Sequence, residues 1–202
     1  NALQSAHLIS GVIAAVYLQD AFHRVKILGL DGKLIREVEL PGMGTVSGLA
    51  GRKEDRETFY HYTSFTVPGT VFHYDVESGV SRVFRQPRLG FDPDRYVTRQ
   101  VFYPSQDGTQ IPMFISHKRG LELNGDAPTY LYGYGGFNLP QLPAFSVPNL
   151  VWMEMGGVFA LANLRGGGEY GKAWHMGGMK ETKQNVFDDM IAAAEWLMQN
   201  NY

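Results

Sequence analysis

Residues 158–172 read VFALANLRGGGEYGK, an apolar run that leads directly into a glycine-rich loop. Apolar residues fill the run almost without interruption, which is typical of a strand buried on both faces of a sheet. Upstream, residues 129–137 read TYLYGYGGF and repeat the arrangement of a strand followed by a glycine-rich loop. What these two loops hold depends on the segments that flank them.

The flanking segments predict an α/β sheet. LGFDPDRY (89–96) is a linker with Pro and Asp, after which Thr98–Tyr103 and Ile111–His117 are predicted strands joined by a turn at Asp107-Gly108. A helix is predicted downstream, where apolar residues recur at helical spacing: Val186, Phe187, Met190, Ile191, Ala194 and Leu197. Hairpin, strand, loop, buried strand, loop and helix together form the opening of an α/β sheet.

Asp188 and Asp189 are adjacent carboxylates near the start of the predicted helix. Paired carboxylates can perform acid–base chemistry, but acidic residues in a first turn commonly compensate for the helix dipole. We therefore predict that both are surface charges.

Residues 1–88 have a different character and predict an all-β structure. Short runs rich in Val, Ile, Tyr and Phe alternate with turn residues. Residues 25–41 resemble residues 69–87, since each reads as a strand, an acidic turn with Gly, a charged strand and a closing Pro. A period of about 40–50 residues is typical of propeller blades. Two unrelated hairpins are the alternative.

Composition restricts the possible partners. The net charge is −2 without a basic run, so neither nucleic acid nor an anionic membrane is an expected partner. Cysteine is absent, which excludes disulfides and thiolate metal sites. The six histidines are scattered without HExxH spacing, so no metal and no cofactor is predicted. No secretory signal pattern is visible, and a cytoplasmic location is expected, although a signal peptide would lie outside this segment.

A nucleotide site is one alternative for the loop at 165–172. Gly166, Gly168 and Gly171 satisfy GxGxxG, and Gly166 to Lys172 begins a P-loop pattern. A P-loop needs Ser or Thr after the Lys to bind Mg²⁺, and here Ala173 follows. The loop also does not open directly into a long helix, as anion binding would require.

An oxyanion site is the other alternative, centred on YGYGG. In α/β-hydrolases the loop after the third strand supplies one donor to the oxyanion and is often glycine-rich. A Tyr hydroxyl in that loop could donate a hydrogen bond. A tight turn with two buried tyrosines explains the same residues, and the pattern alone leaves both open.

Longer motifs resemble the prolyl oligopeptidase family of serine peptidases. They are FYPSQDGTQIPMFISHKRG (102–120), YLYGYGGFN (130–138), NLRGGGEYG (163–171), AWHMGG (173–178) and KQNVFDD (183–189). The resemblance implies β-propeller blades followed by the N-terminal part of an α/β-hydrolase domain, with residues 1–88 as the last blades and 89–202 in the hydrolase. It also implies that Tyr134 is the oxyanion donor and that Phe137 lines the pocket for the substrate proline, whereas RGGGEYG is structural.

No Gly-x-Ser-x-Gly elbow occurs in the chain. The resemblance implies that Ser, Asp and His follow the helix at the end of this chain, so the triad is expected beyond Tyr202. The resemblance implies that the parent protein hydrolyses short peptides on the carboxyl side of proline through an acyl-enzyme, as a monomer. This segment alone is predicted to be inactive. The alternatives are a related oligopeptidase or acylaminoacyl peptidase of the same fold, a nucleotide-binding α/β protein and a non-catalytic propeller scaffold.

Two further expectations concern single positions. His175 follows Trp174 beside a glycine pair and is interpreted as structural. Because a segment of a larger fold has incomplete sheets, we expect exposed apolar side chains within both Val158–Leu164 and Met190–Leu197.

Overall fold

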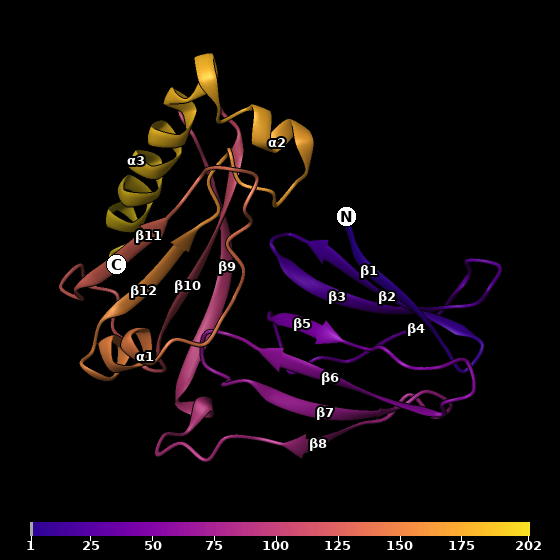
Figure 1. Ribbon diagram of the computed structural model, residues 1–202. Helices are drawn as coiled ribbons and strands as arrows, with labels where there is room; N and C mark the ends of the chain where they lie inside the picture. Colours follow the sequence, from indigo (N-terminus) through magenta and orange to yellow (C-terminus); the bar gives the residue numbers. More distant parts are fainter. Residues whose placement is uncertain (1) are drawn as a thin grey trace. The chain divides into compact units, whose positions relative to one another are not determined.

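The computed structural model describes residues 2–202, and these form two compact units (Figure 1). The first unit comprises the chain up to Phe91 together with Leu142–Phe145. The second comprises Asp92–Gln141 and Ser146–Tyr202. The chain therefore returns briefly to the first unit in the middle of its second half.

The first unit contains two four-stranded antiparallel sheets whose strands follow chain order. One sheet consists of β1 (Ala2–Ile9), β2 (Val12–Gln19), β3 (Phe22–Leu28) and β4 (Leu34–Glu37). The other consists of β5 (Thr45–Gly48), β6 (Glu57–Thr63), β7 (Thr70–Asp75) and β8 (Ser81–Arg85). The sequence repeat falls on β3–β4 and β7–β8, the last two strands of each sheet. The all-β prediction for this region is confirmed.

A single core joins the two sheets of the first unit. Burial alternates along β6, as expected for a strand with one covered face, and Tyr60 and Tyr62 point inward. They pack with Tyr74 and with aliphatic side chains of the other sheet, including Ile9 and Ile27. Each sheet therefore buries one face against the other, which is how successive propeller blades are stabilised.

Leu142–Phe145 is held to this unit by polar and aromatic contacts. The Thr45 hydroxyl donates to the Pro143 carbonyl at 2.7 Å, and the Phe145 amide donates to the Thr63 hydroxyl at 3.2 Å. The Phe145 ring stacks on Phe91 with centroids 5.7 Å apart. These contacts explain why a short stretch of the later chain belongs to the β-sheet unit.

The second unit is built on one mixed sheet with the strand order β11-β12-β10-β9. Its strands are β9 (Tyr96–Pro104), β10 (Gln110–Lys118), β11 (Thr129–Gly133) and β12 (Val158–Ala162), and its α-helices are α1 (Val147–Glu154), α2 (Lys172–Met176) and α3 (Gln184–Gln199). β9 and β10 form the predicted hairpin, and β11 runs parallel to β12 with α1 between them in the chain. The predicted α/β order is confirmed.

Val158–Leu164 is fully buried, so the expectation of exposed side chains there is wrong. β12 lies between β10 and β11, and its inward side chains pack in one cluster with Val186, Ala193 and Leu197 of α3. The strand thus finds all its neighbours within this chain. On α3 the expectation holds, since Ile191 remains 56% exposed.

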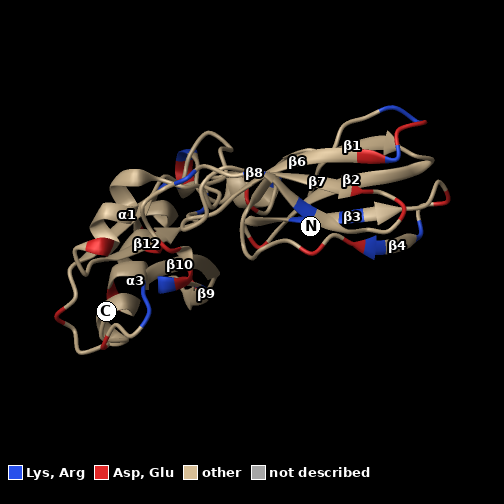
Figure 2. Ribbon diagram, turned by 90° about the horizontal axis from the view of Figure 1, so that it is seen from below, with Lys and Arg blue, Asp and Glu red and all other residues tan. Residues whose placement is uncertain are grey.

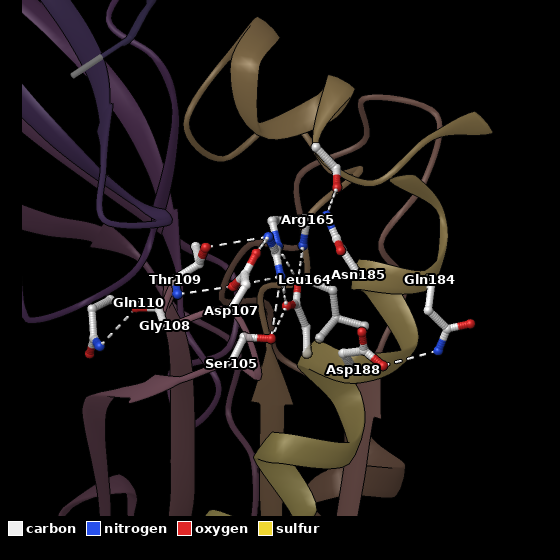
Figure 3. Close-up of polar contacts among 12 residues, drawn as sticks. Ser105, Asp107, Gly108, Thr109, Gln110, Leu164, Arg165, Gln184, Asn185 and Asp188 are labelled. Carbon is white, nitrogen blue, oxygen red and sulfur yellow. Dashed lines mark hydrogen bonds and ion pairs between the residues drawn. The ribbon is translucent and has the colours of Figure 1, made fainter. Parts of the chain in front are cut away.

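Arg165 joins three elements of this unit from the start of the RGGGEYG loop (Figure 3). Its guanidinium forms an ion pair with Asp189 of α3 at 2.6 Å and another with Asp107 of the β9–β10 turn at 2.5 Å. Its backbone amide also donates to the Asp189 carboxylate at 3.0 Å. The Ser105 hydroxyl donates to the same carboxylate at 2.6 Å.

The prediction that Asp188 and Asp189 are both surface charges is wrong for Asp189. The Asp189 side chain has no exposed area, whereas Asp188 is partly exposed and accepts a hydrogen bond from Gln184 of its own helix. A buried carboxylate persists when its charge is paired and its oxygens accept hydrogen bonds. Arg165 and Ser105 provide both conditions.

We predict that Asp189→Ala lowers the free energy of unfolding by about 3–5 kcal/mol, because it leaves the buried Arg165 guanidinium with Asp107 as its one carboxylate partner. The neighbouring substitution Asp188→Ala is the matched control and should change stability by less than about 0.5 kcal/mol. Urea unfolding of the full-length protein, followed by tryptophan fluorescence, measures both variants. Equal losses for the two variants would contradict the assigned role of the ion pair.

A second prediction concerns acid stability. Hydrogen bonds from Arg165 lower the pKa of Asp107 from 3.8 to about 2. Because the folded pKa is lowered, this carboxylate contributes its full stabilisation above pH 3.8 and loses it as the pH falls towards 2. The Tm difference between the wild type and Asp107→Asn should therefore be largest above this window and disappear at its lower end. A Tm difference that is independent of pH would exclude the mechanism.

Candidate functional site

The two glycine-rich loops lie against each other at the ends of β11 and β12. The Asn138 amide donates to the Gly166 carbonyl at 3.1 Å. A β-carbon at Gly166 would lie 2.6 Å from the Gly135 oxygen, and one at Gly168 would lie 2.6 Å from the Asn138 oxygen. Real side chains do not approach that closely, so glycine is required at both positions. The RGGGEYG loop therefore holds the YGYGGF loop.

The backbone of the YGYGGF loop is unusual on its own account. Gly135 has φ 60°, and a β-carbon there would lie 2.4 Å from a Val186 methyl group. Phe137 and Asn138 follow with φ 54° and 57°, although neither is glycine. A bulky residue such as Phe in the left-handed region is an outlier that persists only where the surroundings hold it.

Tyr134 and Phe137 are exposed aromatic side chains that lie beyond the end of β11. Tyr134 directly follows β11 and is 42% exposed, and Phe137 is 82% exposed. Their ring centroids are 6.5 Å apart with an interplanar angle of 28°. In open α/β sheets, ligands bind outside the carboxyl ends of the strands, which is where β11 delivers this pair.

The alternative of a turn with two buried tyrosines does not describe this loop. Tyr132 and Tyr134 are 39% and 42% exposed. Within residues 2–202, no hydrogen bond engages the Tyr134 hydroxyl, so it is available to a bound molecule. A phenol at this position can donate to an oxygen that develops negative charge.

The nucleotide alternative fails on the donors that it would need. A phosphate-binding loop presents its backbone amides to the anion. Here Gly166 donates to the Trp174 carbonyl at 3.0 Å and Gly167 to the Leu164 carbonyl at 3.3 Å. The amide of Gly171 is also occupied by a bond within the loop. The amides of Gly166, Gly167 and Gly171 thus bond within the protein instead of facing a ligand.

Glu169, the acidic residue of the same loop, is a buried structural group that the sequence did not single out. Burial raises the pKa of its carboxyl group. It accepts hydrogen bonds from the Gln141 amide at 2.9 Å and from the Asn163 side chain at 3.3 Å. The Asn163 amide group donates in turn to the Gln141 carbonyl at 2.6 Å. Gln141 follows the YGYGGF loop in the chain, so this cluster fixes where that loop ends.

Two side chains from other segments, Lys183 and His175, contact the backbone of the two loops. Lys183, just before α3, donates to the Gly135 carbonyl at 2.8 Å. His175 lies on α2, and its Nδ1 is 2.7 Å from the Gly166 carbonyl. The sequence predicted a structural role for His175 and assigned none to Lys183. No group of three His, Asp or Glu side chains in residues 2–202 is arranged to hold a metal ion.

Comparisons with known proteins agree with this geometry. The family model described as the prolyl oligopeptidase N-terminal β-propeller domain matches residues 1–87, and the prolyl oligopeptidase family model matches residues 143–202. A prolyl endopeptidase of Elizabethkingia miricola is 50% identical over 95% of this chain. A prolyl oligopeptidase of Omphalotus olearius is 42% identical over 98% of it. The chain spans 27% and 28% of these two relatives.

Solved structures show the same fold. One from a study of two prolyl endopeptidases superposes on 99% of this chain with a TM-score of 0.91 and 46% identity, and 30% of its own chain is covered. Prolyl oligopeptidase B from Galerina marginata, bound to a 35-residue substrate, gives a TM-score of 0.89 at 34% identity over 99% of this chain and 29% of its own. The described fold is therefore propeller blades followed by the start of an α/β-hydrolase domain. The chain belongs to the prolyl oligopeptidase family.

Proposed function

We propose that this chain is part of a serine endopeptidase that hydrolyses short peptides on the carboxyl side of proline through an acyl-enzyme. The observation that carries the proposal is the exposed pair Tyr134 and Phe137 at the carboxyl end of β11. Similar proteins named prolyl endopeptidase support the same substrate class.

Each side chain of the pair has a part in this chemistry. When a serine attacks the peptide carbonyl, negative charge develops on the carbonyl oxygen. The Tyr134 hydroxyl donates a hydrogen bond to that oxygen, and such a donor is worth about 2.7–4 kcal/mol in the transition state. The apolar ring of Phe137 packs against the substrate proline. The serine and its His and Asp partners belong to another part of the protein, so this segment alone is inactive.

The domain assignment is part of the proposal. Residues 1–88 are the last propeller blades, and residues 89–202 begin the hydrolase domain, with Leu142–Phe145 packed on a blade. The order of the two matching family models supports this division.

The remaining partner assignments stay predictions. Basic and acidic residues are interspersed on both units (Figure 2). Nucleic acid and anionic membranes bind to continuous basic surfaces, so neither is proposed as a partner. Among residues 2–202, every helix falls short of the length and apolarity needed to cross a bilayer. We propose that the full-length protein is a monomer, that it needs no cofactor or metal, and that it is located in the cytoplasm.

The substitution Tyr134→Phe in the full-length protein tests the oxyanion role. It removes one hydroxyl and leaves the ring, so the loss should fall on the transition state and lower kcat by up to about 10²–10³-fold, with a smaller effect on KM. A succinyl-Gly-Pro-p-nitroanilide assay measures both constants, and thermal unfolding shows whether the variant remains folded. A folded variant with the kcat of the wild type would remove Tyr134 from the mechanism.

Phe137→Ala tests the proline pocket. Loss of an apolar contact should reduce the preference for proline over alanine before the cleaved bond by about 10–200-fold in kcat/KM. Phe187→Ala is the control, since Phe187 is an exposed Phe on α3 and its loss should leave that ratio unchanged. An unaltered ratio in Phe137→Ala would show that another residue selects proline.

A further inference from the structure

Two of the sequence motifs, AWHMGG and KQNVFDD, lie outside the loop that carries Tyr134 and Phe137, yet each sends one side chain to it. From the first motif, His175 Nδ1 lies 2.7 Å from the Gly166 carbonyl and 3.1 Å from the Asn138 amide nitrogen. From the second, Lys183 Nζ lies 2.8 Å from the Gly135 carbonyl. The two side chains therefore reach the backbone on either side of Phe137.

The short contact to Gly166 fixes which proton His175 carries. An unprotonated Nδ1 would place its lone pair against the Gly166 oxygen at 2.7 Å, which is repulsive. With Nδ1 protonated, the ring donates to that oxygen, and the Asn138 amide donates to the same oxygen at 3.1 Å. A carbonyl oxygen accepts two hydrogen bonds, so this tautomer satisfies both donors. His175 and Asn138 are thereby tied to one atom of the RGGGEYG loop.

These bonds act where the backbone is strained. Phe137 and Asn138 both have positive φ, a region in which a bulky residue such as Phe is rarely found unless its surroundings hold it. Glycine contacts alone exclude side chains but supply no attraction beyond close packing. Lys183 donates to the Gly135 carbonyl within the strained loop. His175 donates to the Gly166 carbonyl, the same oxygen that accepts the Asn138 amide, so it acts on the strained loop through this shared acceptor.

We infer that His175 and Lys183 are positioning residues that hold the Tyr134–Phe137 loop in the conformation used for binding and transition-state stabilisation. Both side chains bond to backbone carbonyls: Lys183 to Gly135 of this loop and His175 to Gly166, which also accepts the Asn138 amide. The inference rests on the proposed function for its kinetic consequences, but the conformation of the loop can be measured without it.

The decisive comparison is His175→Leu with His175→Asn in the full-length protein. Leu and Asn have similar shapes, but only Asn keeps an N–H donor at the δ position. Because a displacement of about 1 Å at a reacting group can cost about 10²-fold, we expect kcat/KM for succinyl-Gly-Pro-p-nitroanilide to fall by about 10–100-fold in His175→Leu. In His175→Asn it should remain within about threefold of the wild type, and His7→Leu, on β1 of the propeller unit, controls for the exchange of a histidine.

Hydrogen–deuterium exchange of the peptide containing residues 134–139 gives a second measurement that needs no activity. Exchange should be faster in His175→Leu and in Lys183→Met than in the wild type, and unchanged in His175→Asn. In the double variant His175→Leu/Lys183→Met, the increase in exchange rate should be smaller than the sum of the increases in the two single variants, because both bonds restrain the same pair of loops.

The outcomes separate the inference from the proposed function. If the wild type does not cleave after proline, the proposed function fails. The exchange rates alone then test whether His175 and Lys183 restrain the loop. If the wild type cleaves and both His175→Leu and Lys183→Met keep its kcat/KM and its exchange rates, the inference is overturned. If His175→Leu does not fold, Lys183→Met decides by the same two measurements. A loss of Tm with unchanged kcat/KM and exchange in the folded fraction would show a role in stability only.

Discussion

The contact between Gly135 and Gly166 is the constraint on which the site depends. A β-carbon at either residue would lie within 2.9 Å of the other loop or its neighbours, so the two backbones touch without side chains between them. This contact brings the ends of β11 and β12 together and determines where Tyr134 and Phe137 emerge. A glycine-rich loop that resembles a nucleotide motif is explained here by the close approach of another backbone.

Arg165 extends the same constraint into the body of the second unit. Its carbonyl oxygen packs beside Gly135, and its guanidinium is paired with Asp107 and Asp189. One residue thus links the loop contact to the β9–β10 hairpin and to α3. Because a buried guanidinium is stable only when it is fully paired, the hairpin turn, the loop and the helix must adopt their positions together.

The sequence predicted those features that depend on local pattern. The apolar run at Val158–Leu164 identified a strand buried on both faces, and Asp107-Gly108 identified the hairpin turn. The burial of Asp189 was missed, although Val186, Asp189, Ala193 and Leu197 share one face of α3 at helical spacing. A carboxylate on a buried face needs a charged partner, and the pattern of the helix did not indicate that Arg165 would supply it. The meeting of the two loops was not predictable either, since nothing in one glycine-rich segment indicates the other.

The left-handed backbone conformation of Phe137 is consistent with the role proposed for its side chain. Glycine would adopt φ 54° at this position with no steric penalty, but it lacks the ring for which we propose a contact with the substrate proline. The loop therefore carries a bulky side chain in an unfavourable conformation, and glycines at the neighbouring contacts leave room for it. Polar contacts next to this backbone come from segments outside the loop: Lys183, just before α3, bonds to the Gly135 carbonyl, and His175 of α2 bonds to the Gly166 carbonyl that also accepts the Asn138 amide. The strained backbone of an exposed aromatic residue and the polar bonds to the neighbouring carbonyls therefore occur together at one site.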